Sequence, residues 1–124
     1  MPIKISDILN NIFNNAKEIA INKYNITLQH ESTEPNIAIW KPAMSMHAHY
    51  DDADYKNYNV SALFYINDDY AGGEINFTEY NYAIKPQANS LIIFPGSKMF
   101  KHEVKTVTYG YRYTSSVWFT FDGR

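Results

Sequence analysis

The sequence predicts a mainly β domain that begins with one helix, and its composition supports this in two ways. Of the 124 residues 16% are aromatic, including 11 tyrosines, and bulky planar side chains favour pleated surfaces. Hydrophobic residues make up 45% of the chain and charged residues 19%, a balance that permits a buried core and is not typical of disorder. We therefore expect one domain over residues 1–124, with a supporting helix at 6–22 and a β core at 26–121.

The predicted helix rests on apolar residues that recur at spacings of three and four. Ser6 and Asp7 are both suitable N-caps for it. The apolar positions are Ile8, Leu9, Ile12, Phe13, Ala16, Ile19 and Ala20. Such a stripe predicts an amphipathic helix that packs on the sheet.

The rest of the chain alternates with a period of two, which indicates strands. Segments 26–30 and 36–40 are predicted to pair with each other across the turn-prone residues 31–35, and the polar segment 51–59 is predicted to be an exposed loop with a lid-like position. Further strands are expected at 60–67, 74–77, 82–85, 90–94, 102–107 and 111–121. Short strands at this spacing predict a sandwich or barrel.

Charge and composition exclude several functions. The net charge of -2 gives no broad positive field, so we expect no nucleic acid as a partner. Because the chain has no cysteine, any metal must be held by imidazole and carboxylate groups. No signal peptide or apolar membrane span is evident, so we expect a soluble, cytoplasmic protein without a membrane partner.

A cluster of potential metal ligands follows residue 46. Side chains two apart on a strand share a face, so His47, His49 and Asp51 are predicted to project the same way, and His102 opens a later strand that can lie beside them. Two imidazoles and one carboxylate with open positions suit ferrous iron that handles oxygen and a co-substrate, whereas zinc usually prefers a more closed site. For His47 a surface or outer-shell position is favoured over direct ligation.

The last predicted strand carries an arginine on its inner face. That face consists of Arg112, Thr114, Ser116, Trp118 and Thr120. A guanidinium inside a small β fold is costly without a carboxylate partner, and no protein carboxylate is evident beside Arg112. A bound dicarboxylic acid would complete the pair through two parallel hydrogen bonds.

Short motifs between Trp40 and Phe119 occur in a distinctive order. They are His49-Tyr50-Asp51, Leu63-Phe64-Tyr65-Ile66-Asn67, Ala71-Gly72-Gly73-Glu74, residues 86–94, His102-Glu103-Val104 and Gly110-Tyr111-Arg112. Arg112 follows His102 by ten positions, and Trp118 follows six later. In this order and spacing the chain resembles the iron(II)/2-oxoglutarate-dependent oxygenases, most closely their prolyl 4-hydroxylase-like branch.

The resemblance implies a double-stranded β-helix, or jelly roll, with a defined set of site residues. It implies that His49, Asp51 and His102 bind Fe(II), with no catalytic residue beyond these ligands, and that Arg112 anchors the far carboxylate of 2-oxoglutarate. Tyr65 and Ser116 would hydrogen-bond the co-substrate, and Trp118 would form a wall of the same pocket. Trp40 stands where this branch commonly has tyrosine, so one hydrogen bond to the co-substrate is replaced or lost; Ala43 and Asn89 stand where glycine is frequent.

The implied activity is a dioxygenase reaction that consumes O2. Members hydroxylate a C–H bond while 2-oxoglutarate is oxidatively decarboxylated to succinate and CO2, with ascorbate as a supporting reductant. Candidate substrates are a peptide, a protein or a small molecule, with a prolyl residue as a weak preference. Self-association, for example as a homodimer, stays open.

Two alternatives share the predicted fold. A cupin-like metal protein would use His47 and His49 together with Asp54 and His102, although the glutamate and Pro-x-Gly spacings usual in cupins are missing. A catalytically silent jelly-roll binding module would use its concave face for a sugar or peptide. A ligand set that includes His47 and not Asp51 would favour the cupin-like alternative.

Overall fold

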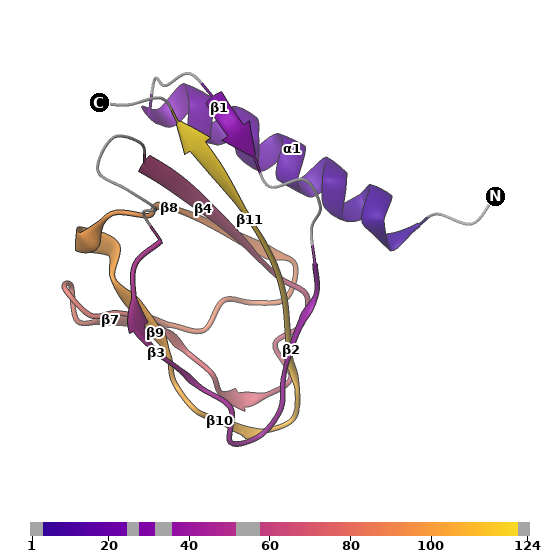
Figure 1. Ribbon diagram of the computed structural model, residues 1–124. Helices are drawn as coiled ribbons and strands as arrows, with labels where there is room; N and C mark the ends of the chain where they lie inside the picture. Colours follow the sequence, from indigo (N-terminus) through magenta and orange to yellow (C-terminus); the bar gives the residue numbers. More distant parts are fainter. Residues whose placement is uncertain (1–3, 25–27, 32–35, 52–57, 122–124) are drawn as a thin grey trace.

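The computed structural model describes residues 4–24, 28–31, 36–51 and 58–121, and Figure 1 shows how its elements are arranged. Along the chain the elements are α1 (Ile5–Tyr24), β1 (Leu28–Glu31), β2 (Ala38–Trp40), β3 (Met46–His49), β4 (Tyr58–Tyr65), β5 (Ala71–Gly72), β6 (Ile75–Phe77), β7 (Tyr82–Ile84), β8 (Ser90–Pro95), a 3-10 turn η1 (Lys98–Phe100), β9 (His102–Val104), β10 (Val107–Tyr109) and β11 (Arg112–Phe121). One helix and many short strands in this described part confirm the predicted mainly β class.

Helix α1 covers the outer face of the larger sheet (Figure 1). Asp7 in its first turn and Lys23 in its last turn have the charges that favour the helix dipole. The shared core consists of Leu9, Phe13, Ala16 and Ala20 from the helix with Val60, Ala62, Phe64, Val117 and Phe119 from the sheet. The predicted stripe is thus confirmed at its centre, whereas Ile8 and Ile19 at its margins are about half exposed because only the middle of the stripe reaches the sheet.

The larger sheet is built around β11, which pairs with β4 along one edge and with both β1 and β2 along the other. The predicted pairing of the first two strands with each other is therefore wrong. β11 has ten residues, so β2 pairs with its beginning and β1 with its end, and each short strand gains a longer partner than the other would supply. β4 also pairs with β8, and it begins at Tyr58, inside the predicted loop; residues 52–57 of that loop lie outside the described part.

The smaller sheet has the strand order β3-β9-β6-β7, and all its pairs are antiparallel. The predicted strand at 102–107 is divided in two. β9 pairs within this sheet, while β10 pairs with β5 in a separate two-stranded ribbon. The chain leaves the sheet at Lys105 and Thr106, so the two halves of the predicted strand have different neighbours.

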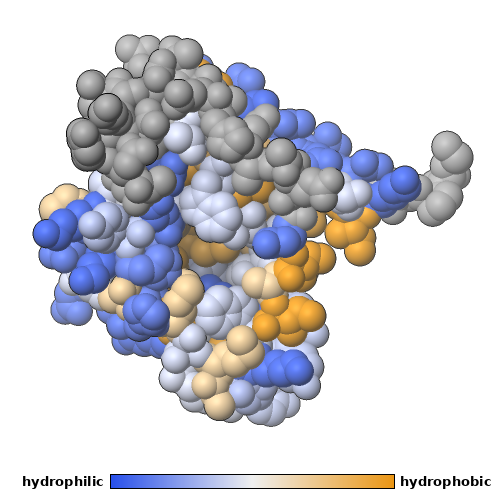
Figure 2. Space-filling view, in the orientation of Figure 1, coloured by the Kyte–Doolittle hydropathy of each residue, from blue (hydrophilic) through white to orange (hydrophobic). Residues whose placement is uncertain are grey.

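The two sheets enclose an interior that opens on the face seen in Figure 2. On this face hydrophilic residues gather over β7 and β9, and hydrophobic ones gather over β2 and the start of α1. Exposed isoleucines such as Ile5, Ile37 and Ile39 account for the hydrophobic side. Within the described ranges no helix is both long and apolar enough to cross a membrane.

Candidate metal centre and anion pocket

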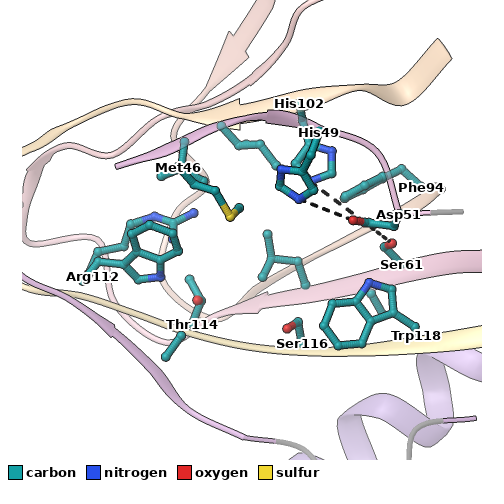
Figure 3. Close-up of a pocket in the computed structure, with 16 residues that line it drawn as sticks. Met46, His49, Asp51, Ser61, Phe94, His102, Arg112, Thr114, Ser116 and Trp118 are labelled. Carbon is teal, nitrogen blue, oxygen red and sulfur yellow. Dashed lines mark hydrogen bonds and ion pairs between the residues drawn. The ribbon is translucent and has the colours of Figure 1, made fainter. Parts of the chain in front are cut away.

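A cavity of about 230 Å³ lies between the two sheets, and its two ends have different chemistry (Figure 3). His49, Asp51 and His102 lie at one end and Arg112 at the other. Thr114, Ser116 and Trp118 follow one wall along β11, as the alternation of that strand predicts.

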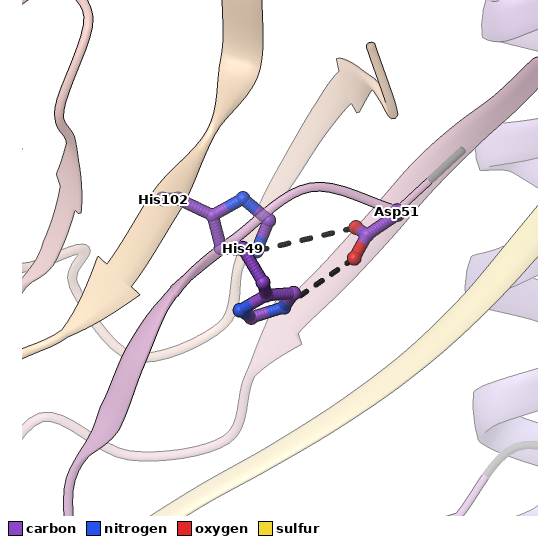
Figure 4. Close-up of side chains that lie close together, drawn as sticks. All are labelled: His49, Asp51 and His102. Atoms are coloured by element: carbon purple, nitrogen blue, oxygen red, sulfur yellow. Dashed lines mark ion pairs between the residues drawn. The ribbon is translucent and has the colours of Figure 1, made fainter. Parts of the chain in front are cut away.

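The strand register brings together the histidines at the first end of the cavity. His49 ends β3, His102 begins β9, and the two are direct cross-strand partners with ring centroids 4.4 Å apart. Asp51 lies two residues beyond β3, with its Oδ1 3.4 Å from His49 Nε2 and its Oδ2 4.0 Å from His102 Nε2 (Figure 4). One potential ligand atom from each of the three residues lies within 4.8 Å of the others.

Backbone carbonyls orient both imidazoles. His49 Nδ1–H donates to the carbonyl of His47 at 3.1 Å, and His102 Nδ1–H donates to that of Phe100 at 2.9 Å. Because a carbonyl can only accept, the proton of each neutral ring lies on Nδ1, and Nε2 keeps its lone pair on the side of Asp51. This is the arrangement that metal-ligating histidines require.

Burial lowers the pKa of His102 below its ordinary value, although the Phe100 carbonyl and Asp51 partly oppose the shift. The residue is only 5% exposed, and the rings of Phe77 and Phe94 pack against its imidazole. The imidazole is therefore neutral at physiological pH, the form that binds a metal.

A β-bulge corrects one expectation about His47. Met46 pairs with Val104 and His49 with His102, so the two residues between them on β3 oppose only Glu103 on β9, and the extra residue breaks the alternation. In consequence Met46 and His49 line the pocket, whereas His47 is exposed. The ligand cluster in the described chain includes Asp51 and not His47, which goes against the cupin-like set; Asp54 lies outside the described residues.

Arg112 forms the opposite end and is 1% exposed. Its Nη2 donates to the hydroxyl of Tyr65 at 2.8 Å, and its guanidinium carbon lies 5.0 Å from the ring centroids of both Trp40 and Tyr65. Trp40 is its cross-strand partner on β2. Burial raises the pKa of Tyr65, an effect that Arg112 only partly offsets, so the phenol stays protonated at neutral pH.

A glycine makes room for this arginine. Gly73 has φ +70°, and a Cβ there would lie 3.0 Å from Arg112 Cδ and 3.2 Å from the Tyr70 ring. A side chain at this position would therefore be strained and would crowd the guanidinium. The turn that contains Gly72 and Gly73 thus lies directly against the pocket's basic end.

Polar hydrogens at the Arg112 end lack partners. Arg112 Nε and Trp40 Nε1 are both buried without a hydrogen bond, and within the described ranges no carboxylate lies at ion-pair distance from Arg112. Unpaired buried donors cost free energy, so this end is suited to an acidic ligand. The donor set at the other end, two imidazoles and a carboxylate without thiolate, fits Fe(II).

Of the other residues predicted for the pocket, two line it and one does not. Ser116 and Trp118 line the cavity, but Tyr65 stands behind Arg112 and is not among the lining residues. Sequence reasoning missed Ser61 and Met46 as lining residues, whereas it placed Thr114 on the inner face of the last strand. Because side chains alternate along β4, Ser61 lies on the same face as Tyr65 and could have been predicted from it. The bulge beside Met46 depends on the partner strand and has no signature in the sequence.

Comparisons with known proteins agree with this geometry. Residues 35–120 match the family model described as the 2OG-Fe(II) oxygenase superfamily. The chain is 42% identical over 69 residues to prolyl 3-hydroxylase 2 of Rattus norvegicus. This match covers 52% of this chain and only 10% of that protein.

Solved structures share the fold. One is the viral collagen prolyl hydroxylase vCPH of Paramecium Bursaria Chlorella virus-1 in its 2OG complex, with a TM-score of 0.78 and 19% identity over 97% of this chain and 75% of that one. Another is a prolyl hydroxylase from Trichoplax adhaerens in complex with a hypoxia inducible factor peptide fragment, with a TM-score of 0.72 and 22% identity over 92% and 55%. At these identities the likeness establishes the jelly-roll fold.

Proposed function

The chain belongs to the 2OG-Fe(II) oxygenase superfamily, and from this premise we propose that it is an Fe(II)- and 2-oxoglutarate-dependent dioxygenase that hydroxylates a C–H bond. One observation carries the proposal. A single cavity has a His-Asp-His cluster at one end and a buried arginine with an unpaired donor at the other. This spatial combination supplies one site for a metal and one for an organic acid.

His49, Asp51 and His102 would hold the iron through His49 Nε2, His102 Nε2 and a carboxylate oxygen. When bound, Fe(II) supplies the activation of O2 that couples the oxidative decarboxylation of 2-oxoglutarate to hydroxylation of the substrate. Three protein ligands leave coordination positions open for the co-substrate and oxygen. The low pKa of His102 keeps its ring neutral, so little proton loss must accompany metal binding there.

Arg112 would hold the far carboxylate of 2-oxoglutarate. A guanidinium can donate two parallel hydrogen bonds to a carboxylate, and the contacts of Arg112 with the Trp40 and Tyr65 rings orient that fork. Trp40 Nε1 is a further donor without a partner, so in this chain an indole would replace the tyrosine hydroxyl that the resemblance suggests. Ser116 would donate from the β11 wall.

The substrate would enter beside Trp118, which lines the cavity and is 39% exposed. Relatives named prolyl hydroxylases make a prolyl residue of a peptide or protein the first substrate to test. An exposed indole is well suited to pack against the flat apolar face of a pyrrolidine ring. Ascorbate would serve as an accessory reductant.

The proposal is tested by mixing purified protein with Fe(II), ascorbate and 2-oxoglutarate and measuring succinate, with and without proline-containing peptides. We expect succinate formation that requires Fe(II) and rises with a suitable peptide. The control is the Arg112→Lys variant, which should form far less. Absence of succinate with every peptide, together with no binding of 2-oxoglutarate to the metal-loaded protein, would overturn the proposal.

A further inference from the structure

We propose that Ser61 is a positioning residue that holds Asp51 so that a single carboxylate oxygen faces the metal. The inference rests on the proposed function, because it concerns the same ligand set. It adds a role for a side chain that neither the sequence motifs nor the comparisons single out.

The contact itself is short and partly buried. Ser61 Oγ donates to Asp51 Oδ2 at 2.7 Å, and Ser61 is 4% exposed. Ser61 lies in the middle of β4, paired with Trp118 of β11 on one side and Phe94 of β8 on the other. Its backbone is therefore fixed by two ladders, and its hydroxyl is a donor with little freedom to move.

Asp51 needs such support because it lies beyond the end of β3. Its own N–H donates to the carbonyl of Gly96 at 3.0 Å, and Asn59 Nδ2 donates to its carbonyl at 2.5 Å. Thr120 Oγ1 in turn donates to Asn59 Oδ1 at 2.8 Å, so the support extends to β11. A Cβ on Gly96 would lie 3.2 Å from those of Asp51 and Asn59, which shows how tightly this corner is packed.

The three candidate ligands differ in what orients them. The imidazoles of His49 and His102 are held by backbone carbonyls, whereas the carboxylate of Asp51 is held by the side chain of Ser61. Among these three contacts, only that of Ser61 is therefore removable by substitution. This makes the role of the contact directly testable.

The contact has a consequence for coordination. The hydroxyl competes with the metal for Oδ2 and so favours Oδ1 as the oxygen that binds it; Oδ1 lies 3.4 Å from His49 Nε2. Without the hydroxyl the carboxylate is free to turn and use both oxygens, which would occupy a position that the co-substrate or O2 requires. Partners of this kind typically contribute 10- to 100-fold to metal affinity.

The test uses Co(II) as a probe in the absence of turnover, with the affinity and the visible absorption spectrum as readouts. Ser61→Ala and Ser61→Val remove the hydroxyl, and Ser61→Thr keeps it in nearly the volume of valine. The matched control is Ser115→Ala, because Ser115 is also buried, lies in the same sheet and has an Oγ without a partner. Circular dichroism checks that each variant is folded.

We expect Ser61→Ala and Ser61→Val to bind Co(II) about 10- to 100-fold more weakly, with an altered spectrum, while Ser61→Thr and Ser115→Ala resemble the parent protein. If Ser61→Ala does not fold, the valine and threonine variants still isolate the hydroxyl. Equal affinity and spectra for the parent, alanine, valine and threonine proteins would overturn the inference and leave the proposed function intact. Failure of the parent protein to bind Co(II) would overturn both.

Discussion

The two ends of the pocket are built on different principles. At the metal end, His49 terminates a short strand and Asp51 follows it, and their side chains are 32% and 12% exposed. At the anion end, Arg112 is 1% exposed and lies in the larger sheet, whose outer face is covered by α1. The side chains at the metal end are partly accessible and are held by hydrogen bonds to backbone carbonyls and to Ser61. At the anion end, Arg112 is packed against aromatic rings, and its Nε and the Nε1 of Trp40 have no hydrogen-bond partner.

Because of this difference, we expect substitutions at one end to weaken metal binding and substitutions at the other to weaken co-substrate binding. The metal end depends on the convergence of three side chains, so the loss of one should abolish metal binding and everything that requires it. The anion end depends on one rigid group, so its alteration should weaken the co-substrate and spare the metal.

The largest effect is expected for His49→Ala. The removal of one of three ligands should weaken Co(II) or Fe(II) binding by more than the roughly 100-fold that an outer partner contributes. Metal titration by calorimetry measures the loss. His47→Ala is the matched control, since His47 is exposed and its carbonyl, which orients His49, is kept. Equal weakening in the two variants would contradict the assignment of His49.

Arg112→Lys should show the opposite pattern. Lysine keeps a positive charge but lacks the planar fork, and the loss of one charge-assisted hydrogen bond of about 1.5–3 kcal/mol corresponds to about 10- to 150-fold weaker binding of 2-oxoglutarate. Calorimetry on the metal-loaded protein measures this, and metal affinity should stay unchanged. Lys105→Arg is the control, because it is an exchange between the same two residue types at an exposed position. A parallel loss of metal affinity in Arg112→Lys would show that the ends are not separable.

Trp40→Phe tests whether the indole N–H at the anion end binds the co-substrate. The phenyl ring keeps an aromatic face for the guanidinium and removes only the Nε1 donor together with some ring area. One neutral hydrogen bond is worth about 0.5–1.5 kcal/mol, so binding of 2-oxoglutarate should weaken about 2- to 12-fold. Unchanged binding would mean that the indole N–H does not reach the co-substrate.

The smallest effect concerns the metal-free protein in acid. Burial lowers the pKa of His102, so below its ordinary value of 6.5 the unfolded chain binds a proton that the folded chain does not. The unfolded state then holds more protons, and the free energy of unfolding should fall as the pH decreases from 6.5 towards the folded pKa. Urea unfolding of the parent and of His102→Gln at pH 7.5 and 5.5 measures this. An equal decrease in both proteins would exclude His102 as the cause.

Regular strands made much of this site predictable. Arg112, Thr114, Ser116 and Trp118 line the pocket because β11 alternates without interruption over its length. His49 and His102 were predicted from motif spacing, and the strand register does pair them. Asn89, which stands where glycine is frequent, has a left-handed φ of 66°, an angle that asparagine tolerates better than most residues.

The features that could not be predicted arise from competition between distant segments. Because of the bulge in β3, Met46 lines the pocket wall and His47 does not. A bulge depends on the partner strand, so it could not be predicted from β3 alone. The strands β1 and β2 each had two possible partners, and the longer β11 was the better one. The contact between Ser61 and Asp51 depends on the corner at Gly96, which brings residues ten apart together.

The proposed function requires that one cavity bind a metal at one end and the far carboxylate of 2-oxoglutarate at the other. A crystal structure with Mn(II) and the inert analogue N-oxalylglycine tests it most directly. We expect the ion bound by His49 Nε2, His102 Nε2 and one oxygen of Asp51, with the analogue's distal carboxylate on Arg112. Metal bound elsewhere, or an analogue that leaves Arg112 without contact, would contradict the account.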